Sequence, residues 1–213
     1  MCFYILSQSK KEALEERFRA QAVEIDAYEP EGKVSGFSLP TVPVITTEFP
    51  QHIQFMRWGL IPVWARADKA DELARMTLNA RSETLFEKPS FKGSIMYHRC
   101  LVLVDGFYEW RHEGKKKVPY FIRLQAEQPL ALGGLYALWT HPTTHQTYQT
   151  CSIITTPANP LMTYIHNTKE RMPFILPPEH ERRWIARDLP RAEIEALMQP
   201  LPEELMRAEV MEG

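Results

Sequence analysis

The chain has 213 residues, enough for one domain with a sizeable buried core. Hydrophobic residues make up 44% of it and charged residues 24%, proportions typical of a soluble globular protein. No apolar run approaches the length of a membrane span, and the first residues lack the order of a secretory signal. We expect a cytoplasmic monomer with no membrane partner.

The three cysteines favour a reducing compartment. Cys2, Cys100 and Cys151 are odd in number, lie far apart and include no CxxC pair. This spacing argues against a disulfide framework and against a zinc site. We therefore expect no metal and no cofactor.

Charge is unevenly distributed, although the net charge is only −2. Residues 55–123 carry 13 basic and 8 acidic side chains, whereas residues 179–213 carry 9 acidic and 5 basic ones. A basic middle suggests an anionic ligand such as nucleic acid. A merely solvated surface explains the same charges equally well.

Short strands and helices follow one another in the first half of the chain. Residues 2–7 are uncharged and rich in aromatic and β-branched side chains, which predicts a buried strand. The pattern then predicts a helix over 9–27, strands over 43–48 and 53–58, a short helix over 68–76, and a helix that follows residues 79–84 and ends before Pro89.

The second half is dominated by strands. Residues 100–104 are wholly apolar and predict a central strand that breaks at Asp105. After it the pattern predicts a hairpin turn over 112–118 and strands over 119–124, 129–139, 148–156 and 173–176. It also predicts a helix over 160–166 and two helices within 178–210 before a frayed tail. This order predicts one α+β domain over residues 2–210 with a curved, largely antiparallel, barrel-like sheet flanked by helices; residues 178–213 would be a helical C-terminal segment.

Cys2 is the first residue with unusual chemistry. If the initiator Met1 is removed, Cys2 carries a free α-amine beside its thiol. Both groups are partly nucleophilic near neutral pH. The amine can condense with an aldehyde, and the thiol can then close a ring on the imine. The alternative is that Cys2 simply begins a buried strand.

Three further polar positions are not explained by ordinary packing. Asn79 and Arg81 lie in a polar cluster near the expected core; they suit substrate and phosphate binding, or else a helix cap and an ion pair with Glu83. Glu109 ends the most apolar strand, where burial would raise its pKa and fit it for proton transfer. His166 ends a short helix, which suits either acid–base work or a structural role.

The loop from Trp58 to Trp64 combines tryptophan with glycine and proline. Such side chains suit base stacking or a wedge against nucleic acid. Aromatic residues that fill the core give the same pattern. Residues 115–117, three lysines, suit either phosphate contact or a solvated turn.

Five motifs together resemble the SOS-response-associated peptidase family. They occur in the family's order between position 2 and about 177. They are Met1-Cys2, Trp58-Gly59-Leu60-Ile61-Pro62-Val63-Trp64, Asn79-Ala80-Arg81-Ser82-Glu83-Thr84, Gly106-Phe107-Tyr108-Glu109-Trp110, and Ile165-His166 followed by Arg171-Met172-Pro173.

The resemblance implies an abasic site shield that removes Met1 itself and crosslinks to single-stranded DNA through a thiazolidine at Cys2. Asn79 would orient the sugar and the new N-terminus, Glu109 would move protons, and His166 would assist ring opening. DNA would meet Arg81, Pro40, Trp58, Trp64, Trp110 and Thr155, with the protein lying on the nucleoid when bound. Pro40 and the aromatic loop would displace the opposite strand.

Three departures from the family's pattern concern DNA contact. Phe3-Tyr4 stand where Gly-Arg is common, Phe37-Ser38-Leu39-Pro40 replace Tyr-Asn-x-x-Pro, and residues 167–170 are inserted after His166. Two other functions fit the same residues. One is an N-terminal-nucleophile cysteine hydrolase, with Glu109 and His166 as base and acid. The other is a non-catalytic module that binds single-stranded DNA.

Overall fold

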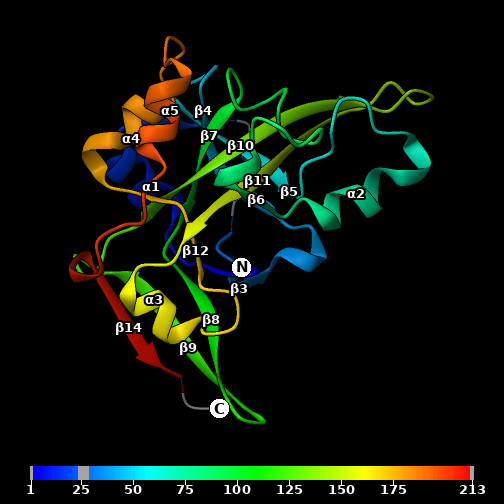
Figure 1. The fold of residues 1–213 in the computed structure, drawn as a ribbon. Coiled ribbons are helices and arrows are strands. Elements are labelled where there is room, and N and C mark those ends of the chain that lie inside the picture. The colour runs from blue at the N-terminus through cyan, green and yellow to red at the C-terminus, as the bar shows by residue number, and fades with distance from the viewer. Residues whose placement is uncertain (1, 24–28, 212–213) are drawn as a thin grey trace.

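The computed structural model describes residues 2–23 and 29–211 and consists of a β-barrel joined to a second sheet (Figure 1). The predictions for Met1, for residues 24–27 of the first helix and for residues 212–213 lie outside the described residues. Within the described part, no helix is long and apolar enough to cross a membrane.

The barrel runs in the order β11-β10-β7-β4-β5. Parallel pairing of β11 with β5 closes the ring, with Thr150 opposite Arg57 and Cys151 opposite Trp58. The other neighbours in the ring are antiparallel. The bounds are β4 Thr41–Thr46, β5 His52–Trp58, β7 Arg99–Val104, β10 Leu130–Thr140 and β11 Thr147–Pro157. This arrangement confirms the predicted α+β fold with a curved, largely antiparallel core.

Short strands extend the barrel at its seams. β2 pairs with β5, β6 and β12 pair with β11, and β13 pairs with β10. Their bounds are β2 Gln21–Ala22, β6 Asn79–Arg81, β12 Arg171–Pro173 and β13 Ile175–Leu176.

The second sheet is antiparallel throughout, in the order β14-β9-β8-β1-β3. The chain passes from the barrel into it at Asp105, where the sequence predicted a break between strands. Asp105 accepts hydrogen bonds from the backbone of Gln8 and Ser9, which fixes the end of β1 beside the start of β8. The bounds are β1 Tyr4–Ser7, β3 Gly32–Ser35, β8 Gly106–Glu113, β9 Lys116–Leu124 and β14 Met206–Val210.

The helices cover the barrel and one flank of the second sheet. α1 (Lys11–Phe18), α4 (Pro178–Trp184) and α5 (Arg191–Leu197) gather at one end of the barrel, while α3 (Pro160–Ile165) lies beside β8 (Figure 1). α2 (Ala70–Met76), together with the 3₁₀ turn that precedes it, matches the helix predicted over 68–76. α3 begins as predicted: Asn159 accepts a 2.8 Å bond from the Met162 N–H and Pro160 takes the first helical position.

Three predicted elements are wrong. The first helix ends at Phe18, because Arg19 adopts the left-handed conformation and Gln21 bonds to the Gln51 carbonyl as the chain enters β2. Residues 79–81 form β6, since β11 offers them a pairing edge, and the helix predicted before Pro89 is reduced to a 3₁₀ helix at Ser82–Thr84 and the turns after it. The expected frayed tail is β14, paired with β9 from Met206 opposite Leu124 to Val210 opposite Tyr120.

A buried arginine joins the barrel to α4. Arg99, on β7, is fully buried and donates to the carbonyls of Trp184, Ile95, Met96 and Ala186. Burial lowers its pKa to about 10, so it keeps its charge at neutral pH. These bonds stop the carbonyls at the end of α4 from being buried without a donor.

Replacing Arg99 with Met should therefore lower the free energy of unfolding by on the order of 3 kcal/mol, because several buried carbonyls lose their donor at once. Chemical denaturation measures this. Arg187→Met is the matched control: this exposed arginine reaches carbonyls only at 3.4 Å, so its loss should cost less than about 0.5 kcal/mol. Equal losses for the two variants would contradict the role given to Arg99.

Candidate functional site

Cys2 lies two residues before β1, the strand of the second sheet that pairs with β3 and β8. Its side chain has no exposed surface, and its carbonyl accepts a 2.8 Å hydrogen bond from Nδ2 of Asn79. Burial raises the pKa of the Cys2 thiol far above its ordinary value, and the carboxylate of Glu109 raises it further. The thiol is therefore protonated at neutral pH.

Glu109 reaches the same place from the neighbouring strand. β1 and β8 pair with Tyr4 opposite Tyr108, so Glu109 lies one residue further along β8, next to the beginning of β1. Its side chain is 6% exposed. Because its carboxylate affects the pKa of both Cys2 and His166, it lies within electrostatic reach of both.

His166 is the residue that ends α3, and its ring is nearly buried. Nδ1 lies 2.9 Å from the carbonyl oxygen of Arg171 and 3.3 Å from the Arg171 backbone nitrogen, so the backbone of Arg171 fixes the orientation of the ring. Burial lowers the pKa of His166, while the carboxylate of Glu109 opposes that shift. His166 is thus suited to accept a proton at neutral pH.

A solvent-open cavity of about 540 Å³ gives access to this group. Glu109 and His166 lie in its wall, and Phe3, the residue after Cys2, lies there as well. The other lining residues are Tyr4, Trp110, His112, Lys117, Thr168 and Lys169. A molecule that enters the cavity therefore meets Glu109 and His166.

Asn79 completes the group from β6. Parallel pairing of β6 with β11 sets Asn79 opposite Ile153 and Arg81 opposite Thr155. The Nδ2 group of Asn79 donates to the Cys2 carbonyl, but the buried Oδ1 atom of Asn79 has no hydrogen-bond partner among the described residues. This acceptor lies beside the main chain of Cys2 and is costly to bury without a donor. Four predicted residues, from four different elements, thus come together.

Comparison with known proteins places the chain in a family. The family model described as SOS response associated peptidase (SRAP) matches residues 1–212. The chain belongs to the SRAP family.

Named relatives and a solved structure agree with the SRAP assignment. The chain is 41% identical over 155 residues to abasic site processing protein YoqW of Bacillus subtilis (strain 168), covering 72% of this chain and 66% of YoqW. It is 35% identical over 149 residues to abasic site processing protein HMCES of Xenopus tropicalis, covering 61% and 44% of the two chains. The matches thus span less than two thirds of these relatives. A crystal structure of a protein from Bacteroides thetaiotaomicron superposes with a TM-score of 0.95 at 40% identity, covering 99% of this chain and 92% of that one.

The buried Arg171, for which the sequence indicated no role, joins the strands next to the candidate site. Arg171, on β12, donates to both carboxylate oxygens of Glu83 and to the carbonyl and hydroxyl of Thr155. The expected ion pair between Arg81 and Glu83 is therefore replaced by one between Arg171 and Glu83. Burial would raise the pKa of Glu83, but the bonds from Arg171 outweigh it and lower the pKa. Only the three-dimensional pairing of β11 with β6 and β12 reveals this network.

Two residues predicted to bind DNA have no surface to do so. Trp58 is fully buried, and its indole N–H donates to the Leu78 carbonyl, so it is a core residue. Thr155 is also fully buried and supports Arg171. The sequence could not separate Trp58 from Trp64, because both lie in the same aromatic motif.

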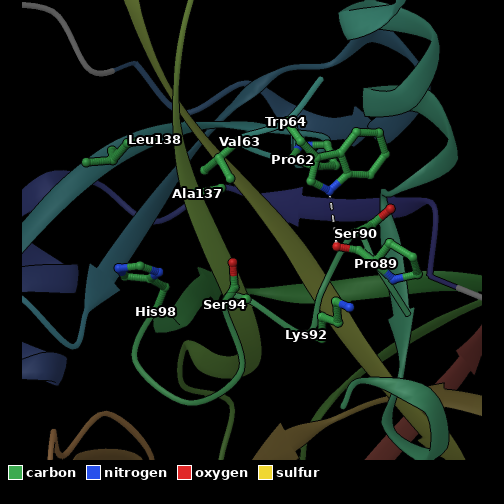
Figure 2. A pocket seen from close by; sticks show the side chains of 11 residues that line it. Pro62, Val63, Trp64, Pro89, Ser90, Lys92, Ser94, His98, Ala137 and Leu138 are labelled. Carbon is green, nitrogen blue, oxygen red and sulfur yellow. Dashed lines mark hydrogen bonds between the residues drawn. The ribbon is translucent and has the colours of Figure 1, made fainter. Parts of the chain in front are cut away.

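The other predicted contacts are accessible to different degrees. Arg81 is exposed, and no hydrogen bond or ion pair to its side chain occurs among the described residues. Pro40 and Trp110 are partly exposed. Trp64 is 55% exposed and lines a separate, more apolar cavity of about 680 Å³, with its indole directed at the Pro89 carbonyl (Figure 2).

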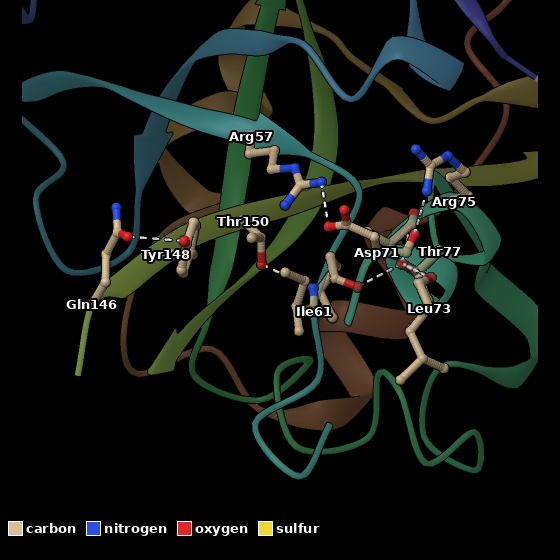
Figure 3. Close-up of polar contacts among 11 residues, drawn as sticks. Arg57, Ile61, Asp71, Leu73, Arg75, Thr77, Gln146, Tyr148 and Thr150 are labelled. Carbon is tan, nitrogen blue, oxygen red and sulfur yellow. Dashed lines mark hydrogen bonds and ion pairs between the residues drawn. The ribbon is translucent and has the colours of Figure 1, made fainter. Parts of the chain in front are cut away.

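Hydrogen bonds join the loop between Trp58 and Trp64 to β11 and to the end of α2 (Figure 3). The Ile61 N–H donates to Thr150 at 3.0 Å, and the Thr77 hydroxyl donates to the Leu60 carbonyl at 2.5 Å. Gly59 has a φ of +121°, and a Cβ there would lie 2.8 Å from the Ala74 carbonyl oxygen, so only glycine fits. No group of three or more His, Cys, Asp or Glu side chains in the described ranges could hold a metal ion.

The lowered pKa of His166 predicts a measurable titration. NMR should place the imidazole pKa below its usual 6.5 in the folded protein, and Glu109→Gln should lower it further by removing the opposing carboxylate. Because the unfolded state then binds the proton more tightly, His166 should make the free energy of unfolding fall as the pH drops below about 6.5. A pKa above 6.5, or one raised by Glu109→Gln, would contradict this electrostatic assignment.

Proposed function

We propose that this protein processes abasic sites in single-stranded DNA by forming a thiazolidine crosslink between Cys2 and the ring-opened sugar aldehyde. The observation that carries the proposal is that Glu109 and His166 line one cavity and lie within electrostatic reach of the buried Cys2, whose carbonyl is hydrogen-bonded to Asn79. The names of the relatives, abasic site processing proteins, support the substrate. The crosslink would shield the damaged strand during the DNA damage response.

The first step is removal of Met1 by hydrolysis of the Met1–Cys2 bond, carried out by the protein itself. The exposed α-amine then attacks the aldehyde carbon to give a carbinolamine, which loses water to form a Schiff base. The thiol sulfur adds to the imine carbon while its proton passes to a base, and the ring nitrogen gains a proton. One water is released in total from amine, aldehyde and thiol.

The site residues divide this work among themselves. Glu109 carries protons between the amine and the departing water, and His166 accepts a proton during sugar ring opening. Asn79 Oδ1, which lacks a partner among the described residues, would accept a hydrogen bond from the new α-amine. Arg81 would bind a phosphate, and Pro40, Trp64 and Trp110 would contact the strand.

The electrostatics favour this reaction over a cysteine hydrolase. A thiol that attacks an amide needs its pKa lowered, commonly by an imidazolium. In the chain that retains Met1, burial and Glu109 raise the pKa of Cys2, and burial lowers that of His166, so a thiolate–imidazolium pair is disfavoured in that form. An amine that attacks first, followed by a neutral thiol that transfers its proton as it adds, needs no such pair.

Intact-mass measurement after incubation with single-stranded DNA carrying one abasic site should reveal a protein lacking Met1 and a denaturation-resistant adduct. Cys2→Ala should abolish the stable adduct, because an amine alone gives only a reversible Schiff base. Cys151→Ala, which alters another fully buried cysteine, is the matched control and should leave the adduct intact. An undiminished adduct with Cys2→Ala would refute the thiazolidine.

Glu109→Gln should slow adduct formation about 10²–10⁴-fold by removing the proton carrier, with the DNA still bound. Quenched time courses measure the rate, and binding to DNA with a stable, aldehyde-free abasic analogue checks affinity. Turnover of amide substrates without DNA would instead support the hydrolase. Salt-sensitive binding with no covalent product at all would support the non-catalytic module.

A further inference from the structure

Aromatic side chains gather beside the cavity, and three of them, Phe3, Tyr4 and Phe37, have no role in the reaction proposed above. Phe3 and Phe37 lie with ring centroids 4.8 Å apart and planes tilted by 32°. The ring centroid of Tyr4 lies 6.4 Å from that of Phe37 and 5.1 Å from that of Trp110, both in an edge-on arrangement. Phe3, Tyr4 and Trp110 line the cavity, while Phe37 is 48% exposed.

The backbone holds Phe3 and Phe37 together. The Phe3 carbonyl accepts a 2.8 Å hydrogen bond from the Gly36 N–H, so the 3₁₀ turn Gly36–Ser38 is fixed to the chain that carries Cys2. The turn closes with Leu39 at a φ of 54°, whose N–H bonds to the Gly36 carbonyl. An apolar ring that is half exposed yet rigidly placed is ready to bind a flat partner without a large loss of conformational entropy.

Positive charge accompanies the rings. The Lys33 ammonium lies 4.6 Å from the ring centroid of Tyr108, 5.3 Å from that of Trp110 and 5.5 Å from that of Tyr4. Lys117 and Lys169 lie in the cavity wall, the latter on the inserted segment 167–170. Asn167 fixes that segment to β8 through two hydrogen bonds with the backbone of His112. Flat rings beside fixed cations suit a polyanion whose subunits carry π-faces.

We propose that Phe3 and Phe37 form a stacking platform for the unpaired base of the nucleotide next to the abasic site. The inference rests on the proposed function, since it places a DNA strand across the same cavity. Phe3 directly follows the reacting residue, so a base stacked there belongs to a nucleotide adjoining the sugar bound at Cys2. That base has lost its stacking partner within the strand, because the neighbouring base is missing.

The test uses a single-stranded oligonucleotide with a tetrahydrofuran abasic analogue, which has no aldehyde, and 2-aminopurine beside it. Stacking on Phe37 should quench the 2-aminopurine fluorescence. Phe37→Ala should weaken binding about 5- to 150-fold and remove the quenching, the range measured for single bases on aromatic side chains. Phe37→Trp should preserve both.

Phe49→Ala is the matched control, because Phe49 is 44% exposed and contacts His52, away from the cavity. It should leave affinity and quenching unchanged. Replacing the flanking base by a second tetrahydrofuran should weaken wild-type binding and leave Phe37→Ala with no further loss. An effect of Phe37→Ala that persists without the flanking base, or equal behaviour of Phe37→Ala and Phe49→Ala, would overturn the platform.

The two proposals fail in different ways. If wild-type protein forms the adduct with aldehyde-bearing DNA but Phe37→Ala binds the analogue normally, the platform is wrong and the crosslinking function stands. If binding of the analogue depends on Phe37 and the flanking base but no adduct forms, the crosslinking function is wrong and the platform stands as a single-strand site.

Discussion

Strand β11 is the constraint on which the rest of this structure depends, since it pairs with β10, β12, β5 and β6. Its parallel pairing with β5 closes the barrel, and its parallel pairing with β6 brings Asn79 to the beginning of β1. Its antiparallel pairing with β12 positions Arg171, whose carbonyl oxygen contacts the imidazole of His166. One strand thus assembles a site whose members lie far apart in the sequence.

Burial decides how the reactive groups can behave. Desolvation keeps the Cys2 thiol protonated and also keeps His166 neutral. The carboxylate of Glu109 raises the pKa of both groups, which partly offsets the effect of burial on His166 and adds to it on Cys2. Such a site is poorly suited to a charged nucleophile and well suited to a sequence of small proton transfers. In the proposed reaction, the group that starts the chemistry is an amine that exists only after the chain has been shortened by one residue.

Much of the fold and site could be predicted because the relevant signals are local. The Asn159-Pro160 pair marks the beginning of α3, and the apolar run at 100–104 marks a central strand. The errors are tertiary. Residues 206–210 form a strand because they pair with the edge of β9, and their own sequence does not predict one. Trp58 is buried and Trp64 exposed because of the residues around them in the fold, not because of the motif that holds both. The ion pair between Glu83 and Arg171 joins residues 88 positions apart, which no sequence spacing can indicate.

The position of β1 between β3 and β8 has a mechanical consequence. Four residues of β1 are registered on β3 and three on β8, and both pairings are antiparallel. In the proposed crosslink, a pull on the DNA attached at Cys2 would act along the strand, at right angles to these hydrogen bonds. The bonds on both edges would then bear the load together instead of unzipping one after another. The fold would anchor a taut DNA strand with the resistance of a sheet sheared as a whole.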